Sequence, residues 1–259
     1  MFDSQGLIHQ GRSSGLNAYK QEFAQKIDHG TLSEVIKNTD VFLGLSQPNL
    51  LSQDMVRSMA QNPIIFAMSN PDPEITYPDA KMARPECIMG TGRSDFPNQV
   101  NNVSGFPYIF RGALDVRAKT INEEMKLAAA RALADLAREP VPEEIKQAYQ
   151  VKELSFGPDY IIPKPLDHRV LEWEAHAVAQ AAMQTGVARK QIDLQTYSKE
   201  LKNNMQASLK RINNFIKAYN LDIWGSYWSK VQGKNISTHN LEIYKRTNDL
   251  CICCTGLSL

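Results

Sequence analysis

Short apolar runs that end in small polar residues recur in the first part of the chain. They are DVFLGLS (40–46), PIIFAMSN (63–70) and ECIMGTG (86–92). Nearly continuous apolar strands are typical of a sheet that is covered on both faces. The helically spaced segment NLLSQDMVRSMAQ (49–61) separates the first two runs. This order of strand, helix and strand predicts parallel pairing with right-handed crossovers.

The residues at the predicted strand ends are Ser46, Ser69 with Asn70, and Thr91 with Gly92. Open parallel sheets bind ligands outside the carboxyl ends of their strands, and small polar residues there allow a cofactor to approach closely. The same residue types are common in ordinary loops. The pattern alone therefore leaves both interpretations open.

From Lys119 onward the sequence predicts helices. The boundary signals are a capping box of Thr120 and Glu123, Pro142 in a first turn, Asp167 as an N-cap, Gly186 as a C-terminal stop and Asp193 as a further N-cap. Near residue 203 the composition changes, because all 13 prolines of the chain lie before that point and asparagine becomes frequent after it. The run LKRINNFIKAYNLDIW (209–224) predicts one amphipathic helix in this tail.

Composition excludes several classes of partner. The chain has 29 Lys and Arg against 28 Asp and Glu. It therefore lacks the basic excess that is typical of nucleic-acid-binding proteins. No apolar run approaches the roughly 18 residues of a membrane-spanning helix, and no signal core is present, which favours a cytoplasmic protein. The clustered Cys251, Cys253 and Cys254 lack a second ligand pair with zinc spacing, so no metal site is predicted.

The segment 90–124 is the richest in candidate chemistry. Its polar residues include Arg93, Asp95, Asn98, Gln99, Asn101 and Asn102. A neutral amide offers donors and an acceptor without a charge to desolvate, which suits fixing a carboxylate or a nicotinamide amide. A turn that satisfies its own backbone explains the same residues equally well. Because Asn101 and Asn102 are adjacent, we expect one to contact ligand and the other to hold the backbone.

Long motifs of the chain resemble the cofactor-binding domain of the malic enzymes, especially the bacterial type. They are GLIHQGR (6–12), DVFLGLS (40–46), SNPDPEI (69–75), GTGRSDFPNQVNNVSGFPYIFRGALDVRAKTIN (90–122) and FGPDYIIPKPLDHRVL (156–171). The resemblance extends to about Lys190. It implies an α/β fold, an incomplete doubly wound (Rossmann-like) parallel sheet with flanking helices and a C-terminal helical extension. The expected parts are a partial NAD(P)-binding domain (1–118), its helical completion (119–202) and an atypical tail (203–259).

The resemblance also implies oxidative decarboxylation of malate to pyruvate and carbon dioxide, with NAD or NADP as hydride acceptor and Mg or Mn as the metal. By motif match, Asn70 and Asn102 contact both substrate and cofactor, and Asn101 is a weaker substrate contact. Asp3 is expected at the cofactor ribose and Ser46 along the cofactor. An acidic residue at this position favours NAD, but the choice between NAD and NADP stays open.

The family's catalytic Lys and Tyr and its metal-binding carboxylates match no motif of this chain. The only G-x-G, Gly90-Thr91-Gly92, is in the wrong context for a pyrophosphate loop. Phe2 and Asp3 resemble the end of the second strand of a dinucleotide fold, so Met1 is interpreted as an interior methionine and the isolated chain is expected to be inactive and marginally stable.

Three hypotheses follow from the sequence. The first is that the chain is a truncated or split malic enzyme. The second is a non-catalytic dinucleotide-fold fragment that binds a partner, either the matching N-terminal portion or a second copy of the chain. The third is a different nicotinamide dehydrogenase.

Overall fold

The computed structural model describes residues 1–26 and 30–218, and the chain divides into two units, Met1–Lys199 and Glu200–Leu259. Its strands are β1 (Phe2–Asp3), β2 (Gly6–Leu7), β3 (Val41–Gly44), β4 (Ile64–Ala67) and β5 (Ile88–Thr91). Its helices are α1 (Ala18–Glu22), α2 (Leu32–Val35), α3 (Gln53–Ser58), α4 (Tyr77–Ala83), α5 (Phe106–Asp115), α6 (Glu123–Leu136), α7 (Glu143–Ala148), α8 (Arg169–Gln184) and α9 (Leu194–Ala218), with a 3-10 turn η1 (Asn102–Ser104).

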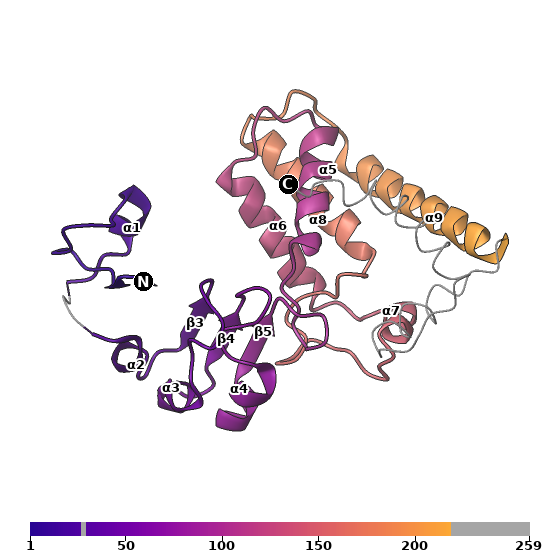
Figure 1. Cartoon of the computed structure of the whole chain (residues 1–259). Helices are drawn as coiled ribbons and strands as arrows, with labels where there is room; N and C mark the ends of the chain where they lie inside the picture. Colours follow the sequence, from indigo (N-terminus) through magenta and orange to yellow (C-terminus); the bar gives the residue numbers. More distant parts are fainter. Residues whose placement is uncertain (27–29, 219–259) are drawn as a thin grey trace, which may run out of the picture. The chain divides into compact units, whose positions relative to one another are not determined.

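The strands β3, β4 and β5 form a parallel sheet in that order, and each lies inside one of the apolar runs of the sequence. The predicted α/β fold with a parallel sheet is thereby confirmed. Helices α3 and α4 lie along one face of this sheet (Figure 1). The core on that face packs Phe42, Ile65 and Met89 of the strands against Val56 of α3 and Ala80 of α4. Burial of these apolar side chains holds the strand ends in place.

The other face of β3 differs from the sequence expectation. Val41, Leu43 and Leu45 expose 48%, 64% and 79% of their surfaces, while Phe42 and Gly44 between them are buried. Among the described residues, β3 is an edge strand with one covered face. A run of apolar residues therefore does not by itself show that both faces are covered, because the covering segments are a tertiary property.

Residues Phe2 and Asp3 also differ from the expectation. They pair antiparallel with Gly6 and Leu7 in a separate two-stranded sheet, and not with the parallel strands. Gly6 has a φ of +104°, a conformation that favours glycine and allows the chain to reverse within two residues. The local partner takes the place of the parallel neighbour that the sequence suggested.

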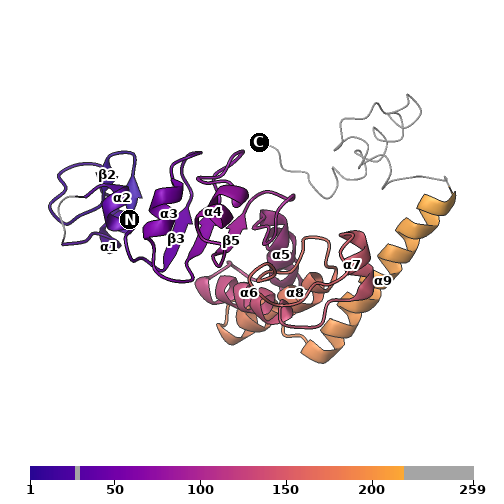
Figure 2. The same cartoon turned by 90° about the horizontal axis from the view of Figure 1, so that it is seen from below.

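Helices α5, α6 and α8 pack on one another and form a second core (Figure 2). The N-cap of α6 is Asn122 and not Thr120, because the helix begins at Glu123 and the Asn122 side chain accepts from the Met125 amide. Asp167 accepts from the Arg169 amide, although the assigned N-cap of α8 is His168. Gly186 ends α8 with a φ of +73°, as predicted.

Helix α9 is longer than the sequence suggested. Asp193 accepts from the Thr196 amide at 2.8 Å, as predicted, but the helix then continues to Ala218 and so crosses the predicted boundary at residue 203. The rest of the tail, including the three C-terminal cysteines, lies outside the described residues. Among the described residues, no helix is long and apolar enough to cross a membrane.

Candidate functional site

The predicted ligand-facing residues of the sheet follow its three strands at one edge. Ser46 comes two residues after β3, Ser69 and Asn70 follow β4, and Thr91 ends β5. Because the strands are parallel and in register, their carboxyl ends share this edge. The location matches the position at which open parallel sheets bind ligands.

Glu74 fixes two of these strand ends. Its side chain is fully buried, and its two oxygens accept from the Ser46 amide at 2.9 Å and from the Ser69 amide at 3.1 Å. Gly44 makes room for the carboxylate, since a Cβ at that position would lie 2.4 Å from the Glu74 Cδ. Sequence reasoning assigned Glu74 no role. The signal was available, because a lone carboxylate between Pro73 and Ile75 enters the core with them.

The side chains of Ser46 and Asn70 are free for a ligand. Both residues are exposed, and neither side chain makes a hydrogen bond to another residue in the described part of the chain. The Asn70–Pro71 peptide bond is cis. Ligand contact by these two residues stays a prediction.

The asparagines of the segment 98–102 have three different environments. Asn98 is buried, and its amide donates to the carbonyls of Met89 at 3.0 Å and Pro158 at 2.7 Å while accepting from the Ile161 amide at 2.8 Å. It therefore satisfies the backbone, which is the alternative that the sequence left open. Asn101 caps η1 by accepting from the Val103 amide at 3.0 Å.

Asn102 is exposed, and its side chain has no hydrogen-bond partner among residues 1–26 and 30–218. Of the two adjacent asparagines, Asn101 holds the backbone and Asn102 is left with a free amide. The backbone role expected of one of the two residues is thus seen at Asn101, whereas contact of either residue with ligand stays a prediction.

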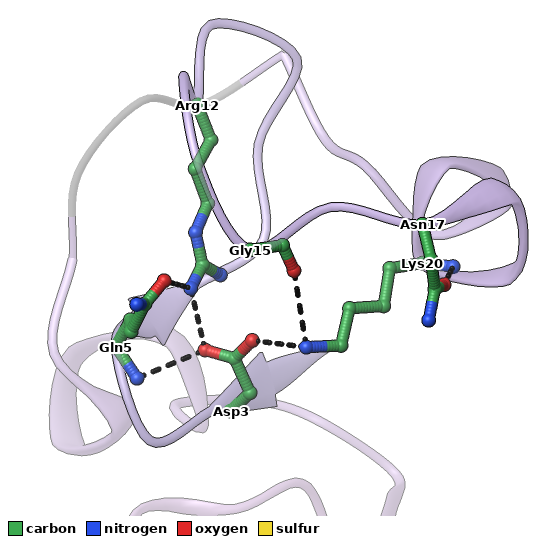
Figure 3. Close-up of polar contacts among 6 residues, drawn as sticks. All are labelled: Asp3, Gln5, Arg12, Gly15, Asn17 and Lys20. Atoms are coloured by element: carbon green, nitrogen blue, oxygen red, sulfur yellow. Dashed lines mark hydrogen bonds and ion pairs between the residues drawn. The ribbon is translucent and has the colours of Figure 1, made fainter.

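Asp3 lies at the centre of a charged cluster, shown in Figure 3. One oxygen accepts from the Gln5 amide at 2.9 Å and from the Arg12 guanidinium at 2.8 Å, and the other accepts from Lys20 Nζ at 2.6 Å. The hydrogen bonds from Arg12 and Lys20 hold the pKa of the Asp3 carboxyl well below its usual range. Asp3 is thus a carboxylate that forms ion pairs with both Arg12 and Lys20. The sequence analysis did not identify either of these basic residues as its partner.

The guanidinium of Arg12 is almost completely buried within this cluster. Its side chain is 8% exposed, and its Nη1 is buried without a hydrogen-bond partner among the described residues. Lys20 donates to the Gly15 carbonyl in addition to Asp3. Two cations against one carboxylate leave an excess of positive charge, which suits an anionic group of a ligand.

A metal site is not formed by the described residues. Within 1–26 and 30–218, no three His, Cys, Asp or Glu side chains lie close enough together to hold a metal ion. The donor set of this part of the chain therefore does not fit the Mg or Mn that the resemblance implies.

Comparison with known proteins gives a family match. Residues 1–155 match the family model described as "Malic enzyme, NAD binding domain". The NADP-dependent malic enzyme of Rhizobium meliloti is 57% identical over 200 residues, which cover 77% of this chain and 26% of the relative. That of Halomonas elongata is 59% identical over 191 residues, covering 73% of this chain and 45% of the relative.

Both nicotinamide cofactors occur in the names of relatives. An NAD-dependent malic enzyme of Rhizobium meliloti is 46% identical over 214 residues, covering 83% of this chain and 26% of the relative. Among solved structures, the malic enzyme of Entamoeba histolytica superposes with a TM-score of 0.73 at 33% identity, covering 86% of this chain and 45% of that one. The chain thus spans about a quarter to a half of the length of these relatives.

Proposed function

We propose a function from one premise: the chain belongs to the malic enzyme family. It is the dinucleotide-binding part of an oxidoreductase that converts malate to pyruvate and carbon dioxide with NADP as hydride acceptor. The observation that carries this proposal is the family match over residues 1–155, which contains every strand of the described sheet.

The free amides of Asn70 and Asn102 supply the ligand contacts. Each can donate to a carboxylate and accept from the carboxamide of a nicotinamide without bringing a charge that must be desolvated. The exposure of both side chains, and their lack of other partners in the described part of the chain, support this role. Glu74 contributes indirectly, since it fixes the backbone from which Ser46 and Asn70 reach the ligand.

The charged cluster at Asp3 favours NADP over NAD. An acidic residue that recognises the ribose 2′-hydroxyl of NAD needs a free acceptor oxygen, whereas cations accommodate the 2′-phosphate of NADP. Asp3 already accepts three hydrogen bonds, from Gln5, Arg12 and Lys20, and the cluster presents the partly exposed Lys20 beside the nearly buried guanidinium of Arg12. Two of the similar relatives are named NADP-dependent, which also supports this choice.

A binding experiment tests the cofactor assignment directly. Purified full-length chain is titrated with NADPH and with NADH, and binding is followed by calorimetry and by nicotinamide fluorescence. NADPH is expected to bind about tenfold more tightly than NADH, because a charge-assisted hydrogen bond to a phosphate contributes about 1.5 kcal/mol. Equal affinities would overturn the NADP assignment, and an absence of binding to either dinucleotide would overturn the function itself.

A second candidate function is association with another polypeptide. The apolar surface of Val41, Leu43 and Leu45 on an edge strand supports it, because exposed edges with apolar faces pair readily with other segments. The proposed occupant is the N-terminal portion of a malic enzyme, and a second copy of the chain is the competing outcome. Analytical ultracentrifugation of the chain alone, and of the chain mixed with the N-terminal portion of the Rhizobium meliloti enzyme, separates the two.

A further inference from the structure

Glu174 is a fully buried carboxyl group in the middle of α8 that neither the fold nor the proposed ligand contacts explain. Its two oxygens are both inaccessible and have no hydrogen-bond partner among the described residues. It lies on the buried face of the helix with Val170 and Val178, four residues away on either side. A buried carboxyl without partners is costly in its charged form.

The carboxyl group lies against the turn that precedes α5. A Cβ built on Gly105 would be 3.7 Å from Glu174 Oε1, which is ordinary van der Waals distance. Gly105 is the N-cap of α5 and also ends η1, which begins at Asn102. Ser104, which directly precedes Gly105, is buried too, and its Oγ lacks a partner in the described part of the chain. Two unsatisfied polar groups are thus associated with the turn that carries Asn102.

The packing around Glu174 offers it no compensating charge. Helices α5 and α8 approach backbone to backbone, since a Cβ on Gly112 would lie 2.5 Å from the Ala175 carbonyl oxygen. The titratable group of α5 near Glu174 is Tyr108, whose pKa is raised first by burial and then by the Glu174 and Asp167 charges. Asp167 itself is paired with Arg169.

Helix α6, which also packs on α8, presents an apolar face to the core, made of Met125, Ala129, Ala132 and Leu136. Arg131 and Asp135 of α6 and Glu172 and His176 of α8 line an open groove of about 480 Å³ outside this core. The other charged residues of α6, Glu123, Glu124 and Lys126, are exposed. Burial alone raises the pKa of Glu174 to about 8, so the group is protonated at neutral pH and loses its proton in mildly alkaline solution.

We propose that Glu174 is a positioning residue that couples the protonation of a buried carboxyl group to the conformation of the Asn101–Gly105 turn, and through it to ligand contact by Asn102. The neutral acid fits the apolar contact between α5 and α8. The anion places an uncompensated charge against Gly105. The turn must then move so that the carboxylate gains partners, either water or the backbone amides at the start of α5. The ligand contact rests on the proposed function, whereas the motion of the turn does not.

The test follows the turn and the ligand separately. Carbon-13 NMR of the full-length chain, labelled at glutamate side chains, measures the titration of Glu174, and amide spectra between about pH 6.5 and about pH 9.5 follow Gly105 and the Asn102 side chain. Wild-type protein is expected to show one transition near pH 8 at all three positions. The transition is expected to vanish at Gly105 and Asn102 in Glu174→Gln and to persist in Glu172→Gln, a partly exposed control on the same helix.

Two results would overturn the coupling. One is a Glu174 carboxyl carbon that does not titrate between about pH 6.5 and about pH 9.5 in the wild-type protein, as would follow from a pKa near the ordinary value of 4.5. The other is a Gly105 transition that survives in Glu174→Gln. For the ligand, NADPH affinity is expected to fall at least about threefold across the same pH range in wild type and to stay constant in Glu174→Gln. A failure of Asn102→Ala to weaken NADPH binding refutes the proposed ligand contact alone, since the Gly105 transition is measured without ligand.

Discussion

Lys20 is the residue on which the proposed preference for NADP depends most directly. Its Nζ lies 2.6 Å from Asp3 and about a third of its side chain is exposed, so it can reach an anion without leaving the cluster. Replacement by Gln is expected to weaken NADPH binding about tenfold, because a charge-assisted hydrogen bond is lost, and to leave NADH binding unchanged. Calorimetric titration of each cofactor measures both effects.

The matched control for this substitution is Lys26→Gln, an exposed lysine of the same segment without a described partner. It removes the same net charge from the chain. If Lys26→Gln weakens NADPH binding as much as Lys20→Gln does, the effect comes from overall charge and not from the cluster.

Gly44 is expected to tolerate no side chain. In Gly44→Ala the new Cβ would meet the Glu74 carboxylate, which is held by two backbone amides and cannot move without breaking them. Overpacking of this kind costs about 2 kcal/mol, to be measured as a loss in the free energy of unfolding by urea titration. Gly157→Ala, whose Cβ would lie 3.9 Å from its nearest neighbour, should change stability little; an equal loss in both variants would count against the Glu74 contact.

Glu174 predicts an unusual dependence of stability on pH. Its pKa is raised in the folded chain from 4.5 to about 8, so the folded state holds the proton and the stabilisation it gives is complete below pH 4.5 and lost as pH rises toward 8. Relative to wild type, Glu174→Gln should therefore gain stability by up to about 1.4 kcal/mol per pH unit through this window and level off above it. Urea titrations at several pH values measure the gap, and parallel curves for the two proteins would contradict the prediction.

At the scale of elements, the edge strand β3 carries the clearest expectation. Leu43→Lys places a charge in the centre of the exposed apolar face of Val41, Leu43 and Leu45 and should reduce self-association of the chain, because charged side chains block edge-to-edge pairing. Light scattering during concentration measures the effect. Leu127→Lys alters a similarly exposed leucine on α6, and an equal reduction of self-association in this variant would show that an added charge anywhere on the surface has the effect.

The elements that the sequence predicted correctly are those whose signals are local. The three parallel strands were identifiable as apolar runs, and Gly186 and Asp193 as helix boundary residues, since each acts within a few residues. The pairing of Phe2 and Asp3 was not predictable, because a two-residue strand pairs with whatever partner the tertiary structure offers. The N-cap of α6 is Asn122 and not Thr120. Both residue types are suitable N-caps, so the sequence alone does not distinguish between them.

The candidate site combines local signals with distant contacts. Motif and strand-end position pointed to Asn70, Asn102 and Ser46, and the structure shows these residues exposed, whereas their contact with a ligand stays a prediction. Glu74, Arg12 and Lys20 were missed because their roles depend on contacts across 28, 9 and 17 residues. Glu174 did leave a signal, since its spacing from Val170 and Val178 places it on the apolar face of α8, but burial of a carboxylate is the exception that periodicity alone does not predict.

For the whole molecule, the proposed function predicts enzymatic activity only when the chain is combined with the N-terminal portion of a malic enzyme. With malate, NADP and Mn, the chain alone is expected to give no NADPH, since the described residues hold no metal donor set. Addition of the separately expressed N-terminal portion of the Rhizobium meliloti enzyme should restore measurable NADPH formation, followed by absorbance. Robust turnover by the chain alone would contradict the assignment of the catalytic groups to another segment, and Leu43→Lys should abolish any restoration if β3 is the docking surface.

Glu74 ties the loop after β3 to the loop after β4 with a single side chain. Neither loop can therefore change its course without disturbing the other. The two loops behave as one mechanical unit, so a displacement of the backbone at Ser46 is transmitted through the Glu74 carboxylate to the backbone at Ser69.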